Sequence, residues 1–183
     1  MKIKEILSLA ATLAAKDDVA TAFSNGTADK TDKTVAKFYT AYDLVISELS
    51  EEIEPLVTSE TMVSDGRISF GDFTEKVKEI LKVERDGREI PFSVEIDGVK
   101  TEAGEVTITY DYLAARADDG NDECPYPDRV FSMRVLAKAV AAEYLLTVGL
   151  FEEAVVLRRA FEAAVTSYAL SKKRKAVRKR TWA

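Results

Sequence analysis

Apolar residues recur at steps of three and four in the first fifty residues, the spacing that places them on one side of an α-helix. The first stripe predicts a helix over about 2–16 and consists of Ile3, Ile6, Leu7, Ala10, Leu13 and Ala14. A short turn and a polar loop follow it. A second stripe predicts a helix over about 34–54, with Asp32 as its N-cap and Pro55 ending it.

The middle of the chain changes to β-branched residues, from about 57 to 113. Val106, Ile108 and Tyr110 alternate with polar residues, which predicts a strand with one solvated face. Asp-Gly pairs between apolar runs are a strong hairpin signal, and they stand at 65–66, 86–87 and 97–98. We expect a small antiparallel sheet with strands near 58–64, 67–71, 79–85, 89–96 and 105–113. The pattern leaves residues 72–80 open between a strand and a helical turn.

Two helices are expected after an acidic loop over 115–128. The segment 128–148 is apolar on most sides, which predicts a buried central helix. Gly149 ends it, and a second helix is expected over 151–170. The apolar stripe of this second helix lies opposite Glu153, Arg158, Arg159 and Glu162, and it consists of Ala154, Leu157, Phe161, Val165 and Tyr168.

These elements predict an α+β fold. N-terminal helices come first, a small antiparallel β-sheet is inserted in the middle, and a C-terminal helical hairpin leads into an extended basic arm. The sequence has no internal repeat and no Pro/Gly/Ser-rich linker. We therefore expect one domain over 1–171, followed by the arm 172–183.

Composition is that of a globular protein, with 183 residues of which 46% are hydrophobic and 32% charged. No apolar run reaches the length of a bilayer, so we expect no membrane partner. The first 16 residues have lysines ahead of an apolar stretch, as a signal peptide does. Polar residues interrupt that stretch at helical spacing, so we interpret it as an amphipathic helix that the mature protein keeps.

The chain has no histidine and a single cysteine, Cys124. Ser-His and Cys-His nucleophile pairs and histidine-ligated zinc sites are therefore excluded. A mechanism that uses only carboxylates needs no histidine, but no motif positions such a pair here. The acidic loop lacks the residue order of an EF-hand calcium site. We expect no catalytic residue, no metal and no cofactor, and a protein that is not an enzyme.

Charge is distributed unevenly along the chain, whose net charge is −6. Residues 172–180 carry seven Lys or Arg and no acid, so the rest of the chain carries a net charge of −13. Such a basic end on an acidic body suits nucleic-acid binding, a solvated tail, or an anchor that meets an acidic protein surface. We favour the anchor, because Trp182 would otherwise be an exposed aromatic side chain. Its expected contact residues are Lys172, Lys173, Arg174, Lys175, Arg178, Lys179, Arg180 and Trp182.

Several segments together resemble a family of structural proteins encoded with the head and neck genes of tailed bacteriophages and prophages of Gram-positive bacteria. The most specific is AAEYLLTVGLFEEAVVLRRAFEAAV, residues 141–165, which resembles the helical hairpin of head-tail connector (adaptor) proteins. The likeness covers nearly the whole chain, and its other segments are ISELSEEIEPL, ISFGDF, VTITYDYLA and the terminal KRTW.

This resemblance implies a virion protein of the neck, made in the host cytoplasm, that forms a ring of twelve copies beneath the portal. DNA would pass through the ring without sequence-specific contact, along a lumen of like charge. The arm would hold the ring to the portal protein, and a neighbouring neck or tail protein would bind elsewhere. The hairpin would mediate self-assembly, and the residues expected to do so are Tyr144, Phe151, Leu157, Phe161 and Tyr168.

The strand-rich middle departs from this family, whose compact members are mostly helical with one small hairpin. The departure leaves open another neck, tail-completion or tail-associated structural role. A nucleic-acid-binding accessory protein that uses the basic arm is the alternative from another class.

Overall fold

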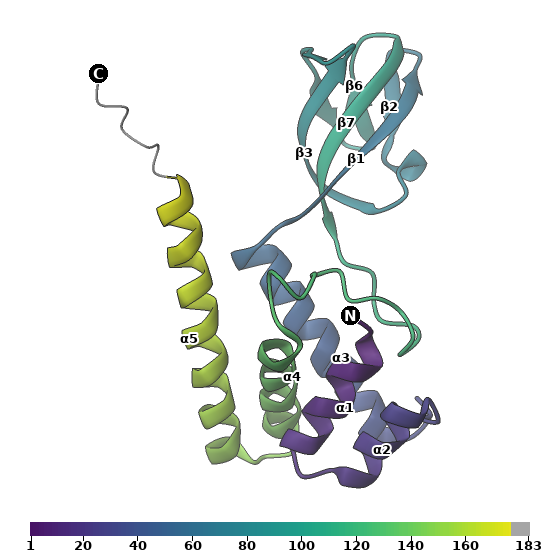
Figure 1. Cartoon of the computed structure of the whole chain (residues 1–183). Helices are drawn as coiled ribbons and strands as arrows, with labels where there is room; N and C mark the ends of the chain where they lie inside the picture. Colours follow the sequence, from purple (N-terminus) through teal and green to yellow (C-terminus); the bar gives the residue numbers. More distant parts are fainter. Residues whose placement is uncertain (177–183) are drawn as a thin grey trace, which may run out of the picture. The chain divides into compact units, whose positions relative to one another are not determined.

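The apolar stripes near both ends of the sequence form α-helices, and the β-branched middle forms two small sheets (Figure 1). The computed structural model describes the backbone of residues 1–176 and the side chains of residues 1–172. The expected α+β fold, with a sheet structure inserted between N-terminal and C-terminal helices, is confirmed.

The chain divides into two compact units where we expected one domain. The first, the helical unit, comprises Met1–Glu48 and Arg116–Ala183. The second, the sheet unit, comprises Leu49–Ala115. The sheet unit is inserted between the two parts of the helical unit, and no Pro/Gly/Ser-rich linker marks either junction. Its strands bury their apolar faces against each other.

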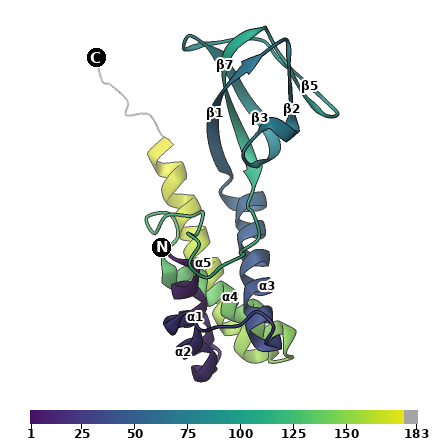
Figure 2. The ribbon, with the colours of Figure 1, turned by 90° about the vertical axis from the view of Figure 1, so that its right-hand side faces the viewer.

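The helical unit is built around α4 (Met133–Thr147), as the all-round apolar pattern predicted. This helix packs against α1 (Ile3–Leu13), α3 (Lys33–Glu48) and α5 (Phe151–Ala176) (Figures 1 and 2). Helix α2 (Asp17–Asn25) packs on α1. Aromatic side chains join these helices, since the rings of Phe38 on α3 and Tyr144 on α4 stack with their centroids 4.0 Å apart.

Helix α4 begins five residues later than we expected, because the segment before it is already a separate turn. The amide of Val130 donates to the carbonyl of Pro127 at 2.8 Å, which closes that turn. Ser132 then takes an extended conformation, and the carboxylate of Asp128 accepts a hydrogen bond from the amide of Met133 at 3.1 Å. Phe131, which we placed inside the helix, instead packs its ring against Tyr126.

The second predicted helix, over 34–54, is also shorter as an α-helix. Its last part, Leu49–Ile53, winds as a π-helix, where the amide of Glu54 donates to the carbonyl of Leu49 at 2.8 Å. Pro55 follows and has no amide hydrogen to continue the helical bonding. None of the described helices is both long and apolar enough to cross a bilayer.

The sheet unit contains a four-stranded sheet in the order β1-β7-β3-β4 and a three-stranded sheet in the order β2-β6-β5. The strands are β1 (Leu56–Ser64), β2 (Arg67–Ser69), β3 (Lys76–Arg85), β4 (Arg88–Glu89), β5 (Ser93–Glu95), β6 (Gly98–Lys100) and β7 (Gly104–Leu113). All neighbours are antiparallel. Residues 72–80, which the sequence left open, end a short 3₁₀ helix (Phe70–Asp72) and begin β3.

The three Asp-Gly pairs have three different structures. Asp86-Gly87 forms the predicted two-residue hairpin between β3 and β4, with φ of 50° and 72°, the two positive values that a type I′ turn requires. In the pair at 97–98, Asp97 lies in the turn between β5 and β6. Gly98 is the first residue of β6 and pairs across the strands with Glu95.

Asp65-Gly66 is not a hairpin, and that prediction is wrong. Both β1 and β2 run antiparallel to the continuous stretch that contains β6 and β7, with Ser64 opposite Gly104 and Arg67 opposite Lys100. The pair is therefore a bend in one long strand. At that bend the amide of Thr101 donates to the carbonyl of Gly66 at 3.2 Å.

Candidate functional site: the α4–α5 hairpin

The predicted helical hairpin is confirmed, and Gly149 makes its turn. Gly149 has φ of 80°, the left-handed conformation that ends many helices and that a side chain disfavours. The amide of Leu150 donates to the carbonyl of Leu145 at 3.0 Å, which satisfies one of the last carbonyls of α4. Helix α5 then runs back along α4 (Figure 1).

One side of α5 faces the helical unit through the predicted stripe. Ala154 and Phe161 are each only 1% exposed, and Leu157 and Val165 are partly buried. Farther along, the ring of Tyr168 packs against Phe131, with centroids 5.1 Å apart. We call this side the inner stripe of α5.

The five residues expected to mediate self-assembly do not form one surface. Tyr144 and Phe161 lie in the core of the helical unit, where they cannot reach another molecule. Leu157 and Tyr168 belong to the inner stripe and are partly buried. Only Phe151, at the first position of α5, is well exposed, at 63%. Four of these five residues therefore pack wholly or partly within the helical unit.

Arg158, which we placed opposite the inner stripe, instead binds three carboxylates. Its guanidinium donates to Glu48 on α3, to Glu143 on α4 at 3.1 Å, and to Glu162 one turn along α5 at 3.1 Å. The hydrogen bond to Glu48 is the main cause that raises the pKa of Arg158 above its ordinary value. A planar guanidinium can serve several acceptors at once, so this residue joins α5 to both neighbouring helices.

The side of α5 opposite the inner stripe is exposed and partly apolar. Residues at alternating steps of four and three share this side, which we call the outer stripe, and they are Glu152, Val156, Arg159, Ala163, Thr166 and Leu170. Val156 is 67% exposed and Leu170 is 54% exposed. Val155 and Phe151 beside them are exposed as well. Apolar residues on two opposite sides of a helix predict that other protein surface covers both sides. The helical unit covers the inner stripe and leaves the outer stripe exposed.

The basic arm begins inside α5 rather than after it. The helix continues to Ala176, so Lys172, Lys173, Arg174 and Lys175 lie in its last turns and not in an extended segment. Arg178, Lys179, Arg180 and Trp182, the remaining predicted anchor residues, lie outside the described residues. The basic charge therefore starts on the same helix as the outer stripe.

The acidic loop over 115–128 binds the first turn of α1. The amide of Ile3 donates to the carbonyl of Asp122 at 3.0 Å, and the amide of Lys4 donates to the carbonyl of Gly120 at 2.7 Å. Such amides have no partner inside their own helix, so the loop satisfies them. Among the described residues, no three His, Cys, Asp or Glu side chains gather closely enough to hold a metal ion.

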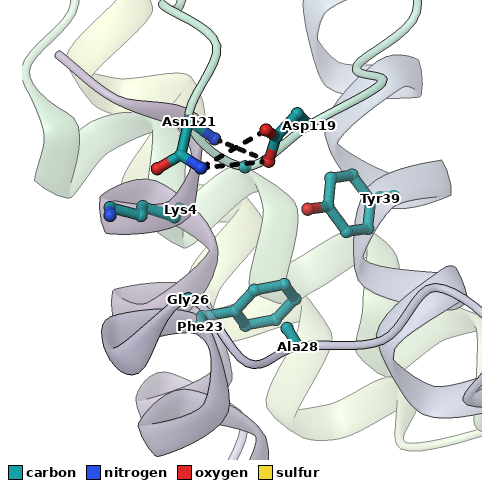
Figure 3. A pocket seen from close by; sticks show the side chains of 8 residues that line it. Lys4, Phe23, Gly26, Ala28, Tyr39, Asp119 and Asn121 are labelled. Atoms are coloured by element: carbon teal, nitrogen blue, oxygen red, sulfur yellow. Dashed lines mark hydrogen bonds between the residues drawn. The ribbon is translucent and has the colours of Figure 1, made fainter.

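A small pocket lies between this loop, α1, α3 and the end of α2 with the loop that follows it (Figure 3). Its volume is about 30 Å³, room for a water molecule and not for a metabolite. Asp119 is held at its edge by the amide of Asn121, which donates at 3.1 Å. The residues that line the pocket are Lys4, Phe23, Gly26, Ala28, Tyr39, Asp119, Gly120 and Asn121.

Cys124 is buried in the helical unit, and burial raises the pKa of its thiol. Burial likewise raises the pKa of the nearby Tyr42 hydroxyl. A thiol in this environment stays protonated and is a poor nucleophile. The structure therefore gives Cys124 a packing role.

The sheet unit contains a hydrogen-bonded pair of side chains, Tyr110 and Glu60, that the sequence did not predict. The hydroxyl of Tyr110 on β7 donates to the carboxylate of Glu60 on β1, and burial together with this hydrogen bond raises the pKa of Tyr110 to about 12. Glu60 also accepts the amide of Thr74 at 3.2 Å. The group ties the segment before β3 to β1 and β7, which is a structural task. Alternation of residues places both side chains on the inward face, but their pairing has no sequence signal.

The outer stripe and the basic end of α5 are thus features that packing within the helical unit does not explain. They occupy one helix, and both are suited to contact with another macromolecule. No protein-family model matches the chain, and a search of curated proteins found no relative.

Proposed function

We propose that the protein is a structural component of the neck of a tailed bacteriophage, a head-tail connector that forms a ring beneath the portal. The observation that carries the proposal is the outer stripe of α5, an exposed and partly apolar surface on the hairpin whose sequence resembles that of adaptor proteins. A ring requires each copy to present such a surface to a neighbour.

Charge supports the rest of the proposal. The chain carries a net charge of −13 outside residues 172–180, and carboxylates repel the phosphates of DNA that passes through a ring. The basic end that begins at Lys172 holds the ring to acidic surface on the portal protein. Arginine and lysine are suited to this because they pair with carboxylates at protein interfaces.

The sheet unit favours a second candidate from the same class. Adaptors of the compact type are mostly helical, and here Leu49–Ala115 forms a separate unit with its own core. A tail-completion protein or another neck protein would use such a unit to contact a different neighbour. Both candidates are structural virion proteins and share the predictions for the basic end.

The test is to co-express the chain with the portal protein of the same genome and to isolate the complex. A variant that ends at Ala176 keeps all of α5, and a variant that ends at Ser171 also removes its basic last turns. We expect the full chain to bind the portal and both truncated chains to lose binding while they keep their helical circular dichroism. Normal portal binding by the chain that ends at Ser171 would contradict the anchor role.

A nucleic-acid-binding protein would behave differently in the same material. The isolated full chain would bind DNA at low salt, and neutralising about seven phosphates would give a slope of log affinity against log salt near −6. We expect no such binding. Binding with that steep dependence on salt would replace the neck proposal with the accessory-protein alternative.

A further inference from the structure

The spacing of the outer stripe is that of a coiled-coil seam. Steps of four and three from Glu152 to Leu170 repeat with a period of seven, which keeps a row of side chains against one straight partner helix. Val156, Ala163 and Leu170 occupy one position of the heptad, and all three are apolar and exposed. The other position is polar and holds Glu152, Arg159 and Thr166.

The seam continues over most of a long helix. Helix α5 has 26 residues and is therefore about 39 Å long, whereas α4 beside it has 15 residues and is about 22 Å long. The outer stripe lies opposite the inner stripe, which faces the helical unit, and all six of its residues are exposed. Within the part of the chain that the structure describes, neither Glu152 nor Arg159 forms an ion pair.

We propose that the outer stripe binds the same stripe of a second copy, with the two α5 helices antiparallel and crossing at Ala163. This register sets Val156 of each copy against Leu170 of the other, so that the exposed apolar residues are covered in pairs. Ala163 meets Ala163 at the centre, where a small side chain lets two helices approach closely. The contact is self-complementary, as a two-fold axis requires.

Charge selects the antiparallel arrangement. The first turn of α5 is acidic, with Glu152 and Glu153, and the sequence of its last turns is Lys-Lys-Arg-Lys at 172–175. Antiparallel helices bring the acidic turn of each copy beside the basic turns of the other. The two helix dipoles then point in opposite directions, which is also favourable. A parallel pair would place like charges together at both ends, which costs free energy.

This two-fold pair is distinct from the contacts of a ring, which join different surfaces head to tail. It is the form of the free protein, and it keeps the apolar seam out of water before any assembly. Both proposals use the outer stripe, so the pair must separate before the stripe can contact a neighbour in a ring. A monomeric free chain would overturn the pair and leave portal binding, which tests the neck proposal, unaffected.

The mass of the full chain in solution tests the pair. We expect sedimentation and light scattering to give a dimer at high micromolar concentration. Val156→Glu and Leu170→Glu each place a charge in the seam and should halve the measured mass without changing the circular dichroism. Leu44→Glu is the matched control, because Leu44 on α3 is 52% exposed and lies off the seam, so this variant should stay dimeric.

A cysteine pair tests the register. Ala163→Cys should form a disulfide-linked dimer under mild oxidation, because the two copies meet at this residue. Glu162→Cys, one position around the helix, and the unchanged chain, whose Cys124 is buried, should not. A monomeric full chain, a mass unchanged by both seam variants, or equal cross-linking at 162 and 163 would each overturn the proposal.

Discussion

The two sides of α5 carry apolar residues at the same kind of spacing but meet different surroundings. On the inner stripe, Phe161 is 1% exposed and packs against the helical unit. On the outer stripe, Val156 is 67% exposed. The periodicity of apolar residues therefore indicates how many sides of a helix other protein surface covers. A second stripe that the folded unit leaves exposed indicates a partner molecule. Substitutions on the two sides should therefore separate stability from association.

Phe161→Ala should have the largest effect on stability. It removes a buried aromatic ring and leaves a cavity beside α4, so the free energy of unfolding should fall by about 4 kcal/mol. Urea denaturation followed by circular dichroism measures this loss. A loss below about 1 kcal/mol would mean that the inner stripe is not packed as described.

Arg158→Ala should come next, with a loss of about 2 kcal/mol, because it leaves Glu48 and Glu143 without their shared cation. Arg158 is still 28% exposed, so solvent screens part of the interaction. Arg158→Lys keeps the charge but not the forked geometry and should lose less. If the lysine variant is as unstable as the alanine variant, the geometry of the guanidinium and not its charge holds α5.

Gly149→Ala should cost about 1 kcal/mol, because a side chain disfavours the left-handed conformation of the turn. Nothing lies within 4 Å of the position that the added carbon would take, so the loss measures backbone strain alone. Thermal unfolding gives the value. An unchanged midpoint would show that the turn can adopt another conformation.

Val156→Ala should have the smallest effect on the fold, within about 0.5 kcal/mol, because the removed atoms are exposed in one copy. The stability should be measured at a concentration where the chain is monomeric, since association adds to apparent stability. A loss as large as that of Phe161→Ala would mean that Val156 is covered within its own chain, which would remove the contrast between the two stripes.

The sequence predicted the features whose cause is local. Helical spacing located the inner stripe of α5, and the all-round apolar pattern identified α4 as central. Asp86-Gly87 was found because Asp-Gly favours the two positive φ values of a type I′ turn, and the strands on either side of it pair with each other. The same dipeptide at 65–66 predicted a hairpin and formed a bend, because pairing with the distant residues 98–112 decides that conformation.

Features that depend on distant partners could not be predicted. Arg158 was placed opposite the apolar stripe, and its partner Glu48 is 110 residues away along the chain, so no local pattern indicates the contact. The loop near Gly120 binds α1 through backbone carbonyls, which have no signature in side-chain type. The outer stripe did have a signal, since Val156, Ala163 and Leu170 are seven residues apart. It was missed because the inner stripe accounted for the helix on its own.

The insertion of Leu49–Ala115 between α3 and α4 also constrains the order of folding during synthesis. The sheet unit is a single continuous stretch and has all its partners once residue 115 leaves the ribosome. Helices α1 and α3, made earlier, must wait for α4, because they pack against it. The sheet unit can thus become native before the helical unit, although α1 and α3 are synthesised earlier.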